Sequence, residues 1–375
     1  MERMRIGIDA KWYFTGPVST QVVLQNLLPE LFALCPEHEW VVFLDKKDKH
    51  LGFPYQEKNI YIRYVWADNN MLSNLFIVPA TFSRAGVEVM LFQTFPSFRR
   101  KVPSISFIHD VLFRGFPQFF TWKERLYFVP LEWLTRHRTD RLIATTGFVA
   151  EDLLKYNYTR SRSRIDIVPL GVSPKFKPLS QHPEALVARV KEKFALPAQY
   201  ILYVGRLNVR KNIENLLKAL PLLHNTGIPL VIIGKNDWKA PDLEKILSLP
   251  EISRRILMPG DMTDEELTVV YAMAKVFCFP SFAEGFGLPP LEAMASGVPV
   301  VVADATALPQ VCGDAAIYID PARPASIAHA LDELLTDEEL YNRKRKSGLE
   351  RASQFTWEKT ARAVLQSIAN ATKNQ

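Results

Sequence analysis

The sequence predicts an α/β protein with two doubly wound parallel sheets in tandem. Two successive series of short, β-branched runs alternate with longer segments of helical period. The runs are apolar without strict alternation, which is typical of strands buried on both faces of a parallel sheet. The chain has 375 residues, well above the roughly 150 of a typical single domain, so two domains are expected.

The first series occupies the amino-terminal half of the chain. Helical periodicity is visible at residues 18–34 and 123–136, between runs that are too short and too β-branched to be helices. The runs expected as strands are residues 5–9, 40–44, 60–65, 89–92, 105–109, 142–145 and 165–169.

A proline-rich stretch, residues 168–197, separates the two series. Proline lacks the N–H that a strand ladder needs, and it stiffens a connection between domains. The prolines of this stretch are Pro169, Pro174, Pro178, Pro183 and Pro197. We therefore expect an amino-terminal domain at residues 1–172 and a carboxyl-terminal domain at residues 173–355.

The second series follows the same plan. Thr263 with Glu266, and Thr336 with Glu339, have the spacing of capping boxes and predict helix starts. Doubly wound sheets bind ligands at the carboxyl ends of their strands, so an active site is expected in a cleft between the two domains. The expected strands are residues 200–204, 230–233, 256–258, 276–279, 298–303 and 316–319.

Composition narrows the class of protein. Apolar residues make up 48% and charged residues 23%, an ordinary globular balance. The net charge of +6 fits a protein that handles phosphates or touches an anionic membrane, and it is too small to imply nucleic acid. The cysteines Cys35, Cys278 and Cys312 are too few and too far apart for a disulfide scaffold or a structural zinc site.

The location predicted from the sequence is cytoplasmic. The first five residues are charged rather than signal-like, and no stretch approaches the roughly 20 apolar residues of a spanning helix. A peripheral position at the inner face of the membrane is the alternative. It rests on the aromatic and basic segment 121–138 and on the basic loop 99–101. Phe128, Leu131 and Leu134 have helical spacing, which is more often that of core residues.

Two carboxylates mark the most informative segment of the second half. Gly285, Gly287 and two prolines keep the chain non-helical as far as residue 288. Glu284 is therefore expected in a loop after a strand, and Glu292 in the first turn of the next helix. Unpaired backbone amides at the start of that helix form a site for an anion.

Two cations are placed to meet the same anion. Arg206 follows a strand and Gly205, and Lys211 comes five residues later in "GRLNVRKN". An arginine fork and a compact lysine charge are suited to a diphosphate. With both cations on phosphate, Glu292 would be available to accept hydroxyl donors such as a ribose diol.

The chain resembles the retaining glycosyltransferases of family 4, which have the GT-B fold of two Rossmann-like domains facing across a cleft. "EGFGLPPLEAMASGVPVV" carries the E-x7-E pattern of that family from Glu284 to Glu292. "GRLNVRKN", "ALPQVCGDAAIYIDP" and "ASQFTWEKTA" match it in order and spacing. In the first half, "RIGIDAKWY", "SFIHDVLF" and "TDRLIATTGFVAEDLLKY" are similar to its mannosyltransferase-type branch.

The resemblance implies a role for each matching residue in the second half. Arg206 and Lys211 would bind the diphosphate of a nucleotide-sugar, and Glu292 would hold the ribose. Glu284 would contact the transferred sugar. The backbone amides would come from Phe286, Gly287 and Leu288, and the base would lie near the backbone of Gly234.

In the first half the resemblance implies two further site residues. It also implies that the last helix of the chain returns to this half. His109 would face the transferred sugar near the reacting carbon, and Gly16 would lie in the loop that approaches the phosphates. Pro17 departs from the glycine-rich loop of the family and removes an amide there. The helix at residues 356–375 would cross back to the first domain.

The implied activity is a retaining hexosyltransferase. It would move a hexose, with mannose from GDP-mannose the leading candidate, to a hydroxyl of a glycan or a lipid-linked saccharide in surface polysaccharide or lipopolysaccharide synthesis. No cofactor and no metal are expected. The alternatives are a transferase using a UDP- or dTDP-sugar (glucose, rhamnose), a nucleotide-sugar epimerase on the same fold, and a non-catalytic partner subunit.

Overall fold

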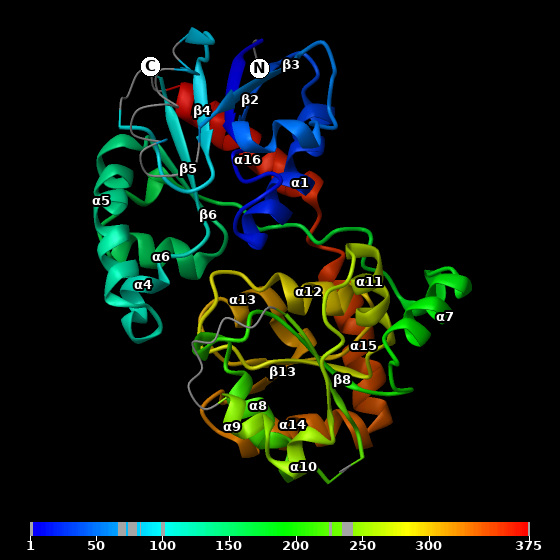
Figure 1. Ribbon diagram of the computed structural model, residues 1–375. Helices are drawn as coiled ribbons and strands as arrows, with labels where there is room; N and C mark the ends of the chain where they lie inside the picture. Colours follow the sequence, from blue (N-terminus) through cyan, green and yellow to red (C-terminus); the bar gives the residue numbers. More distant parts are fainter. Residues whose placement is uncertain are drawn as a thin grey trace. The chain divides into compact units, whose positions relative to one another are not determined.

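The computed structural model describes residues 3–66, 73, 81–82, 84–98, 102–224, 227–234 and 243–373. The chain divides into two compact units, each with its own core (Figure 1). Unit 1 comprises Met1–Gly171 and Thr356–Gln375, and unit 2 comprises Val172–Phe355. The expected boundary after residue 172 lies one residue beyond this division.

Within the described residues, unit 1 contains a seven-stranded parallel sheet in the order β3-β2-β1-β4-β5-β6-β7. Most strands are buried along their whole length, as apolar runs in a two-sided parallel sheet must be. The strands are β1 (Arg5–Asp9), β2 (Glu39–Asp45), β3 (Ile60–Val65), β4 (Val89–Phe92), β5 (Ser104–Ile108), β6 (Arg141–Ala144) and β7 (Ile165–Ile167).

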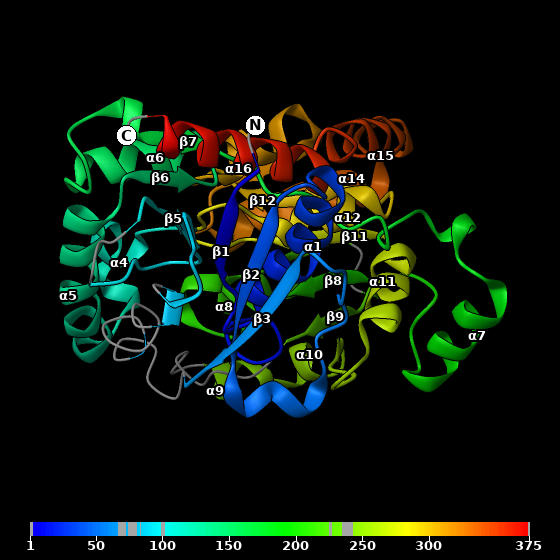
Figure 2. The same ribbon diagram turned by 90° about the horizontal axis from the view of Figure 1, so that it is seen from above.

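Helices cover this sheet, as Figure 2 shows from above. Those described are α1 (Val18–Leu34), α4 (Leu112–Gly115), α5 (Trp122–Arg138), α6 (Gly147–Lys155) and α16 (Trp357–Thr372). The last helix returns from the far end of the chain and packs on α1 and on strands β4, β5 and β6 (Figure 1). Its inward face is apolar and buried: Trp357, Ala361, Val364, Leu365 and Ile368.

Unit 2 repeats the plan with the order β10-β9-β8-β11-β12-β13 in the part of the chain that is described. All of its strand pairs are parallel. The strands are β8 (Ile201–Val204), β9 (Leu230–Ile233), β10 (Ile256–Leu257), β11 (Val276–Phe279), β12 (Val300–Ala303) and β13 (Ala316–Ile319). The predicted fold class, an α/β protein with two doubly wound sheets, is confirmed.

The helices of unit 2 are α7 (Glu184–Lys193), α8 (Ile213–Ala219), α9 (Leu243–Leu247), α10 (Pro250–Ser253), α11 (Asp264–Met273), α12 (Leu288–Ala295), α13 (Leu308–Cys312), α14 (Pro324–Thr336) and α15 (Glu338–Ala352). The capping box of Thr263 and Glu266 is confirmed at the start of α11. The one predicted at Thr336 is wrong, because Thr336 ends α14. Asp337 caps α15 instead, accepting a hydrogen bond from the Leu340 amide.

Both sheets reverse their winding direction at an inner strand. The chain runs outward from β1 to β3, returns, and continues from β4 on the other side; β8 and β11 have the same relation in unit 2. Loops that leave the carboxyl ends of two such neighbouring strands diverge to opposite faces of the sheet. The crevice between them is where ligands bind in open α/β sheets.

Candidate functional site

Two loops leave neighbouring strands at the switch point of the unit 2 sheet. Strands β8 and β11 are paired directly, with Leu202 opposite Phe277. The loop after β8 carries Arg206 and Lys211, and the loop after β11 carries Glu284. The predicted placement of these three residues at one carboxyl edge follows from this pairing.

The carboxylate of Glu284 is buried between two cations. Lys211 Nζ lies 2.7 Å from Oε1, and Arg210 Nη1 lies 3.2 Å from Oε2. The hydroxyl of Ser281 also donates to Oε1. Burial by itself would raise the pKa of Glu284, but the charges of Lys211 and Arg210 hold that pKa below its ordinary value. Glu284 is therefore ionised at neutral pH.

Hydrogen bonds to backbone carbonyls, donated by two side chains and one backbone amide, join the two loops. Arg210 Nη1 donates to the carbonyl of Ala283 at 2.6 Å, and the amide of Phe282 donates to the carbonyl of Arg210 at 2.9 Å. Asn212 has a left-handed backbone (φ 57°), and its side chain donates to the carbonyl of Pro280. The positions of Lys211 and Glu284 are thus set by the loops rather than by their own flexible side chains.

Arg206 lies at the start of the same region and is exposed. Its carbonyl accepts a hydrogen bond from the hydroxyl of Tyr203 at 3.2 Å, which anchors its backbone to β8. The structure places Lys211 against Glu284. That Arg206 and Lys211 grip one diphosphate stays a prediction.

Helix α12 begins with a backbone that only glycine tolerates. Gly287 is its N-cap with φ +113°, and a Cβ atom there would lie 2.7 Å from Leu308 Cδ2. Leu288 is the first helical residue, and among the described residues no side chain caps the helix. Phe286 is buried against Phe355, with ring centroids 6.0 Å apart. Phe286 can therefore offer a ligand its backbone but not its ring.

Glu292 has a different environment from Glu284. It lies one turn into α12, where the hydroxyl of the fully buried Tyr271 donates to its Oε2 at 2.8 Å. Burial raises the pKa of Glu292 to about 7, although the Tyr271 hydrogen bond acts in the opposite direction. Near neutral pH, Glu292 is thus divided between its protonated and ionised forms.

Gly234 follows a third strand, β9, at the same carboxyl edge of the unit 2 sheet. Its φ is +154°, and a Cβ atom there would lie 1.9 Å from the carbonyl oxygen of Gly205. The backbones after β8 and β9 therefore touch, which no residue with a side chain would allow. This close approach accounts for the glycine at position 234.

The two predicted residues of unit 1 both follow strands of its sheet. Gly16 lies in the loop after β1 with φ +138°, and Pro17 is the N-cap of α1. His109 follows β5, and burial lowers its pKa to about 4, so the imidazole is neutral at pH 7. Its Nε2 is buried and has no hydrogen-bond partner among the described residues. That His109 contacts the transferred sugar stays a prediction.

Several functional candidates were missed by the sequence reasoning. Arg210 and Ser281 both bind Glu284, and Tyr271 binds Glu292. Arg210 could have been found, because it adjoins Lys211 in the same motif. Tyr271 could not, since it lies 21 residues from Glu292. In unit 1, Asp9 and Lys11 form a buried ion pair of 3.1 Å at the end of β1.

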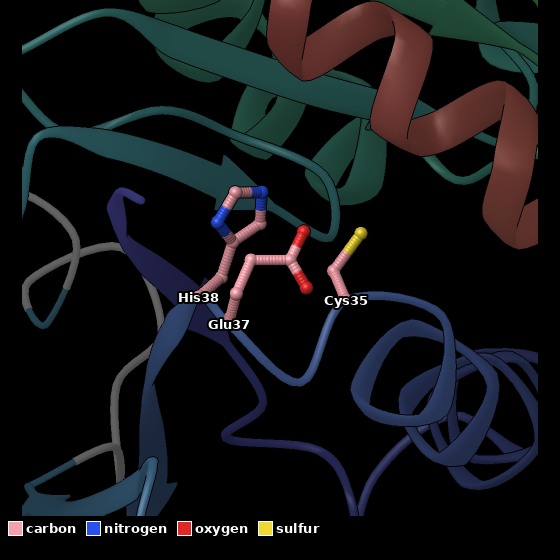
Figure 3. Close-up of side chains that lie close together, drawn as sticks. All are labelled: Cys35, Glu37 and His38. Carbon is pink, nitrogen blue, oxygen red and sulfur yellow. The ribbon is translucent and has the colours of Figure 1, made fainter. Parts of the chain in front are cut away.

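Within the described residues, one cluster of potential metal-ligating side chains is present. Ligand atoms of Cys35, Glu37 and His38 lie within 4.8 Å of one another (Figure 3). However, His38 Nδ1 accepts a hydrogen bond from the Met4 amide at 3.3 Å, so the proton of a neutral ring is on Nε2. Nε2 could bind a metal only after that proton moved to Nδ1, where it would face another N–H. We therefore assign no metal here.

Comparisons with known proteins agree with this geometry. Residues 187–351 match the family model described as glycosyl transferases group 1, and residues 21–176 match the model described as glycosyltransferase family 4. O-antigen chain mannosyltransferase B of Escherichia coli is 33% identical over 261 residues, which are 68% of this chain and 67% of that protein. The chain belongs to glycosyltransferase family 4.

Other relatives agree with this family 4 assignment. The serotype-specific mannosyltransferase WbdA of Escherichia coli is 32% identical over 236 residues, or 61% of this chain. The match spans only 28% of that longer protein. Sucrose-phosphate synthase from Thermosynechococcus elongatus is 19% identical and superposes over 100% of both chains with a TM-score of 0.78. The fold of this family 4 chain is therefore GT-B.

Proposed function

We propose that this family 4 chain is a retaining hexosyltransferase that moves mannose from GDP-mannose. The acceptor would be a hydroxyl of a glycan or a lipid-linked saccharide in surface polysaccharide or lipopolysaccharide synthesis. The observation that carries the proposal is the buried Glu284 held between Lys211 and Arg210 beside the start of α12. The similarity to two mannosyltransferases of Escherichia coli supports the choice of sugar.

The donor would lie along the carboxyl edge of unit 2. Its diphosphate would meet Arg206, Lys211 and the amides of Gly287 and Leu288, where charge and helix dipole favour an anion. An ammonium group has three donors, so Lys211 can hold Glu284 and a phosphate oxygen together. Glu292 would accept the ribose hydroxyls, and the backbone of Gly234 would lie near the base.

The transferred sugar would contact Glu284 of unit 2. An ionised carboxylate accepts hydrogen bonds from sugar hydroxyls, and Glu284 is kept ionised by its two cations. The neutral imidazole of His109 would place its buried Nε2 near the reacting carbon. Unit 1 would also bind the acceptor, and the loop of Gly16 would approach the phosphates.

Transfer would keep the configuration of the sugar. The bond from the anomeric carbon to the phosphate oxygen breaks, and a bond to the acceptor oxygen forms on the same face. The acceptor proton passes to the departing phosphate oxygen. The charge that develops on the phosphate is stabilised by Arg206, Lys211 and the start of α12. No metal has a role in this scheme.

A panel of nucleotide-sugars tests the proposal. GDP-mannose should raise the thermal midpoint of the chain in a concentration-dependent way, and UDP-, dTDP- and ADP-sugars should raise it less. Lys211→Ala should remove the shift, whereas Lys218→Ala, which changes an exposed cation on α8, should keep it. A larger shift of the thermal midpoint with a UDP- or dTDP-sugar would indicate that this nucleotide-sugar, and not GDP-mannose, is the donor.

Product analysis separates the remaining alternatives. With GDP-mannose and an oligosaccharide acceptor, the expected products are GDP and an elongated acceptor with an α-linkage. Conversion of the donor to another nucleotide-sugar without an acceptor would indicate an epimerase. Absence of donor binding across the whole panel would contradict an enzyme and favour a partner subunit.

A further inference from the structure

Helix α5 of unit 1 presents an apolar stripe to solvent. Its members, here named the α5 stripe, are Trp122, Leu126, Val129 and Trp133, with exposed fractions of 63%, 62%, 49% and 48%. Their spacing of four, three and four residues puts them on one face of the helix. Surface helices of soluble proteins usually carry polar residues on such a face, so an exposed apolar stripe needs an explanation.

The stripe is not needed to hold α5 in the fold. The opposite face is buried through Leu131 and Leu134, and Phe128 stacks on Phe113 with ring centroids 4.6 Å apart. Figures 1 and 2 show α5 along the outer edge of unit 1, near α4 and α6. Packing of the core thus explains the inner face of α5 and leaves the outer face unexplained.

Positive charge accompanies the stripe. Lys123 and Arg125 are exposed on the first turns of α5. The two carboxylates of the helix are already engaged: Glu124 closes the capping box with Thr121, and buried Glu132 forms ion pairs with Arg114 and Arg136. On α5 itself, the exposed cations beside the stripe therefore outnumber the free carboxylates, which suits an anionic partner.

The chemistry of this face suits a lipid surface. Tryptophan near each end of the stripe is the side chain that prefers the boundary between headgroups and hydrocarbon. Lysine and arginine beside an apolar face are typical of helices that lie in the plane of an anionic membrane. A second copy of the chain fits less well, because a self-contact through the stripe would join two surfaces that carry the same exposed cations, Lys123 and Arg125, and would supply no anionic partner for them.

We propose that the α5 stripe docks on the surface of an anionic lipid bilayer, with Lys123 and Arg125 on the headgroups. The contact is peripheral: within the described residues, no helix has the length and apolar character to cross a membrane. The basic loop 99–101, which the sequence also offered for this contact, lies outside the described residues. Lipid binding through α5 does not depend on the proposed transfer reaction.

Vesicle co-sedimentation of the full chain tests the proposal. Vesicles of phosphatidylcholine with phosphatidylglycerol should bind the chain, and vesicles of phosphatidylcholine alone should bind it weakly. The double variant Leu126→Gln/Val129→Gln should bind anionic vesicles at least about tenfold more weakly. Lys123→Gln/Arg125→Gln should bind roughly 30-fold more weakly, and added salt should reduce wild-type binding.

Matched variants keep the test specific. Val18→Gln/Leu222→Gln changes the same residue types at exposed positions elsewhere, and Lys191→Gln/Lys218→Gln removes two exposed cations away from α5. Both should bind as the wild type does. All substituted side chains are exposed, so circular dichroism and the thermal midpoint should be unchanged. Equal binding of wild type and stripe variant would overturn the proposal. So would a wild-type dimer that the stripe variant abolishes, without lipid binding.

Discussion

At the scale of single residues, Glu284 and Glu292 show how one motif creates two different carboxylates. They are eight positions apart, yet Lys211 and Arg210 lower the pKa of Glu284, whereas burial beside Tyr271 raises that of Glu292 to about 7. The difference comes from their neighbours: two cations in one case and a neutral phenol in the other. A permanent charge suits the proposed contact with sugar hydroxyls, and a titrating group would make the proposed ribose contact depend on pH.

Removing the ammonium of Lys211 should abolish efficient transfer. Lys211→Ala takes away a charge that would stabilise the departing phosphate, and we expect kcat/KM to fall at least about 100-fold. Glu284→Gln should have a similar effect because the carboxylate no longer accepts the hydroxyls of the sugar. Initial rates with GDP-mannose measure both, with Lys218→Ala as the control. Transfer by Lys211→Ala within threefold of the wild type would refute the diphosphate site.

The raised pKa of Glu292 should make donor affinity depend on pH. If the ionised carboxylate accepts the ribose hydroxyls, affinity rises with pH and levels off above about 7. One unit below that pKa, binding should be about tenfold weaker. Calorimetric titration of GDP-mannose from pH 5.5 to 8.5 measures this. Tyr271→Phe removes a hydrogen bond that lowers the pKa, and it should move the midpoint upward.

The effect of Glu292 on stability has the opposite sign. Its pKa is raised from the ordinary 4.5 to about 7 in the folded chain, so the folded state holds the proton more tightly. The stabilisation is present below pH 4.5 and is lost as pH rises through 7, by at most about 3 kcal/mol. The glutamine of Glu292→Gln cannot titrate. This variant should therefore flatten the pH profile of donor affinity and that of the free energy of unfolding. A variant with unchanged pH profiles would show that another group titrates.

At the scale of elements, three loops at the carboxyl edge of unit 2 form the candidate site because their strands are neighbours. The order β9-β8-β11 brings together Gly234, Lys211 and Glu284, which are far apart in sequence. The loops then fix one another through backbone contacts, such as Phe282 to Arg210 and Gly234 to Gly205. A change in one of these backbones should therefore disturb the fold as well as the site.

Gly234→Ala should destabilise unit 2. The new Cβ atom would lie 1.9 Å from the Gly205 carbonyl oxygen, so β8 and β9 must separate at their ends. We expect a loss of about 3 kcal/mol. Gly260→Ala is the matched control: φ is +82° and no atom of the described residues lies within 4 Å of its Cβ position, so only backbone strain of about 1 kcal/mol is expected. Urea unfolding measures both variants, and equal losses would contradict the contact.

At the scale of the whole molecule, the chain passes between the two units twice. It leaves unit 1 after Gly171 and returns at Thr356. On the unit 2 side, the amide of Val172 donates to the carbonyl of Phe355 at 3.0 Å. On the unit 1 side, a Cβ atom at Gly171 would lie 2.3 Å from the Trp357 nitrogen. The carboxyl-terminal helix is thus a structural part of unit 1.

Ile368→Ala should weaken unit 1 and leave unit 2 intact. Ile368 is fully buried on α16, so the cavity should cost about 2–4 kcal/mol. Hydrogen exchange should become faster in α1 and unchanged in β8 and β11. Gln366→Ala, on the exposed face of α16, is the control. Equal loss of protection in both units would mean that they unfold as one.

Removal of metal ions should leave transfer unaffected. Arg206, Lys211 and the start of α12 would supply the positive charge that a divalent ion provides in other phosphate sites. We expect initial rates within twofold after dialysis against EDTA and in its presence. Added Mg²⁺ or Mn²⁺ serves as the control. A fall in the transfer rate that Mg²⁺ or Mn²⁺ reverses would indicate a metal ion in the donor site.

The amino-acid sequence by itself determined the fold class, most strands and the motif of Glu284, Glu292 and Lys211. Buried strands and helix starts can be predicted from local patterns: apolar runs for the strands, and the spacing of Thr263 and Glu266 for a capping box. Only the tertiary structure decided which partner each carboxylate meets. Arg210 and Tyr271 reach their carboxylates through strand and helix packing, and the pKa of a buried group depends on such neighbours rather than on sequence spacing. The exposure of the α5 stripe was decided in the same way, because periodicity shows that a helix has faces but not which face the core covers.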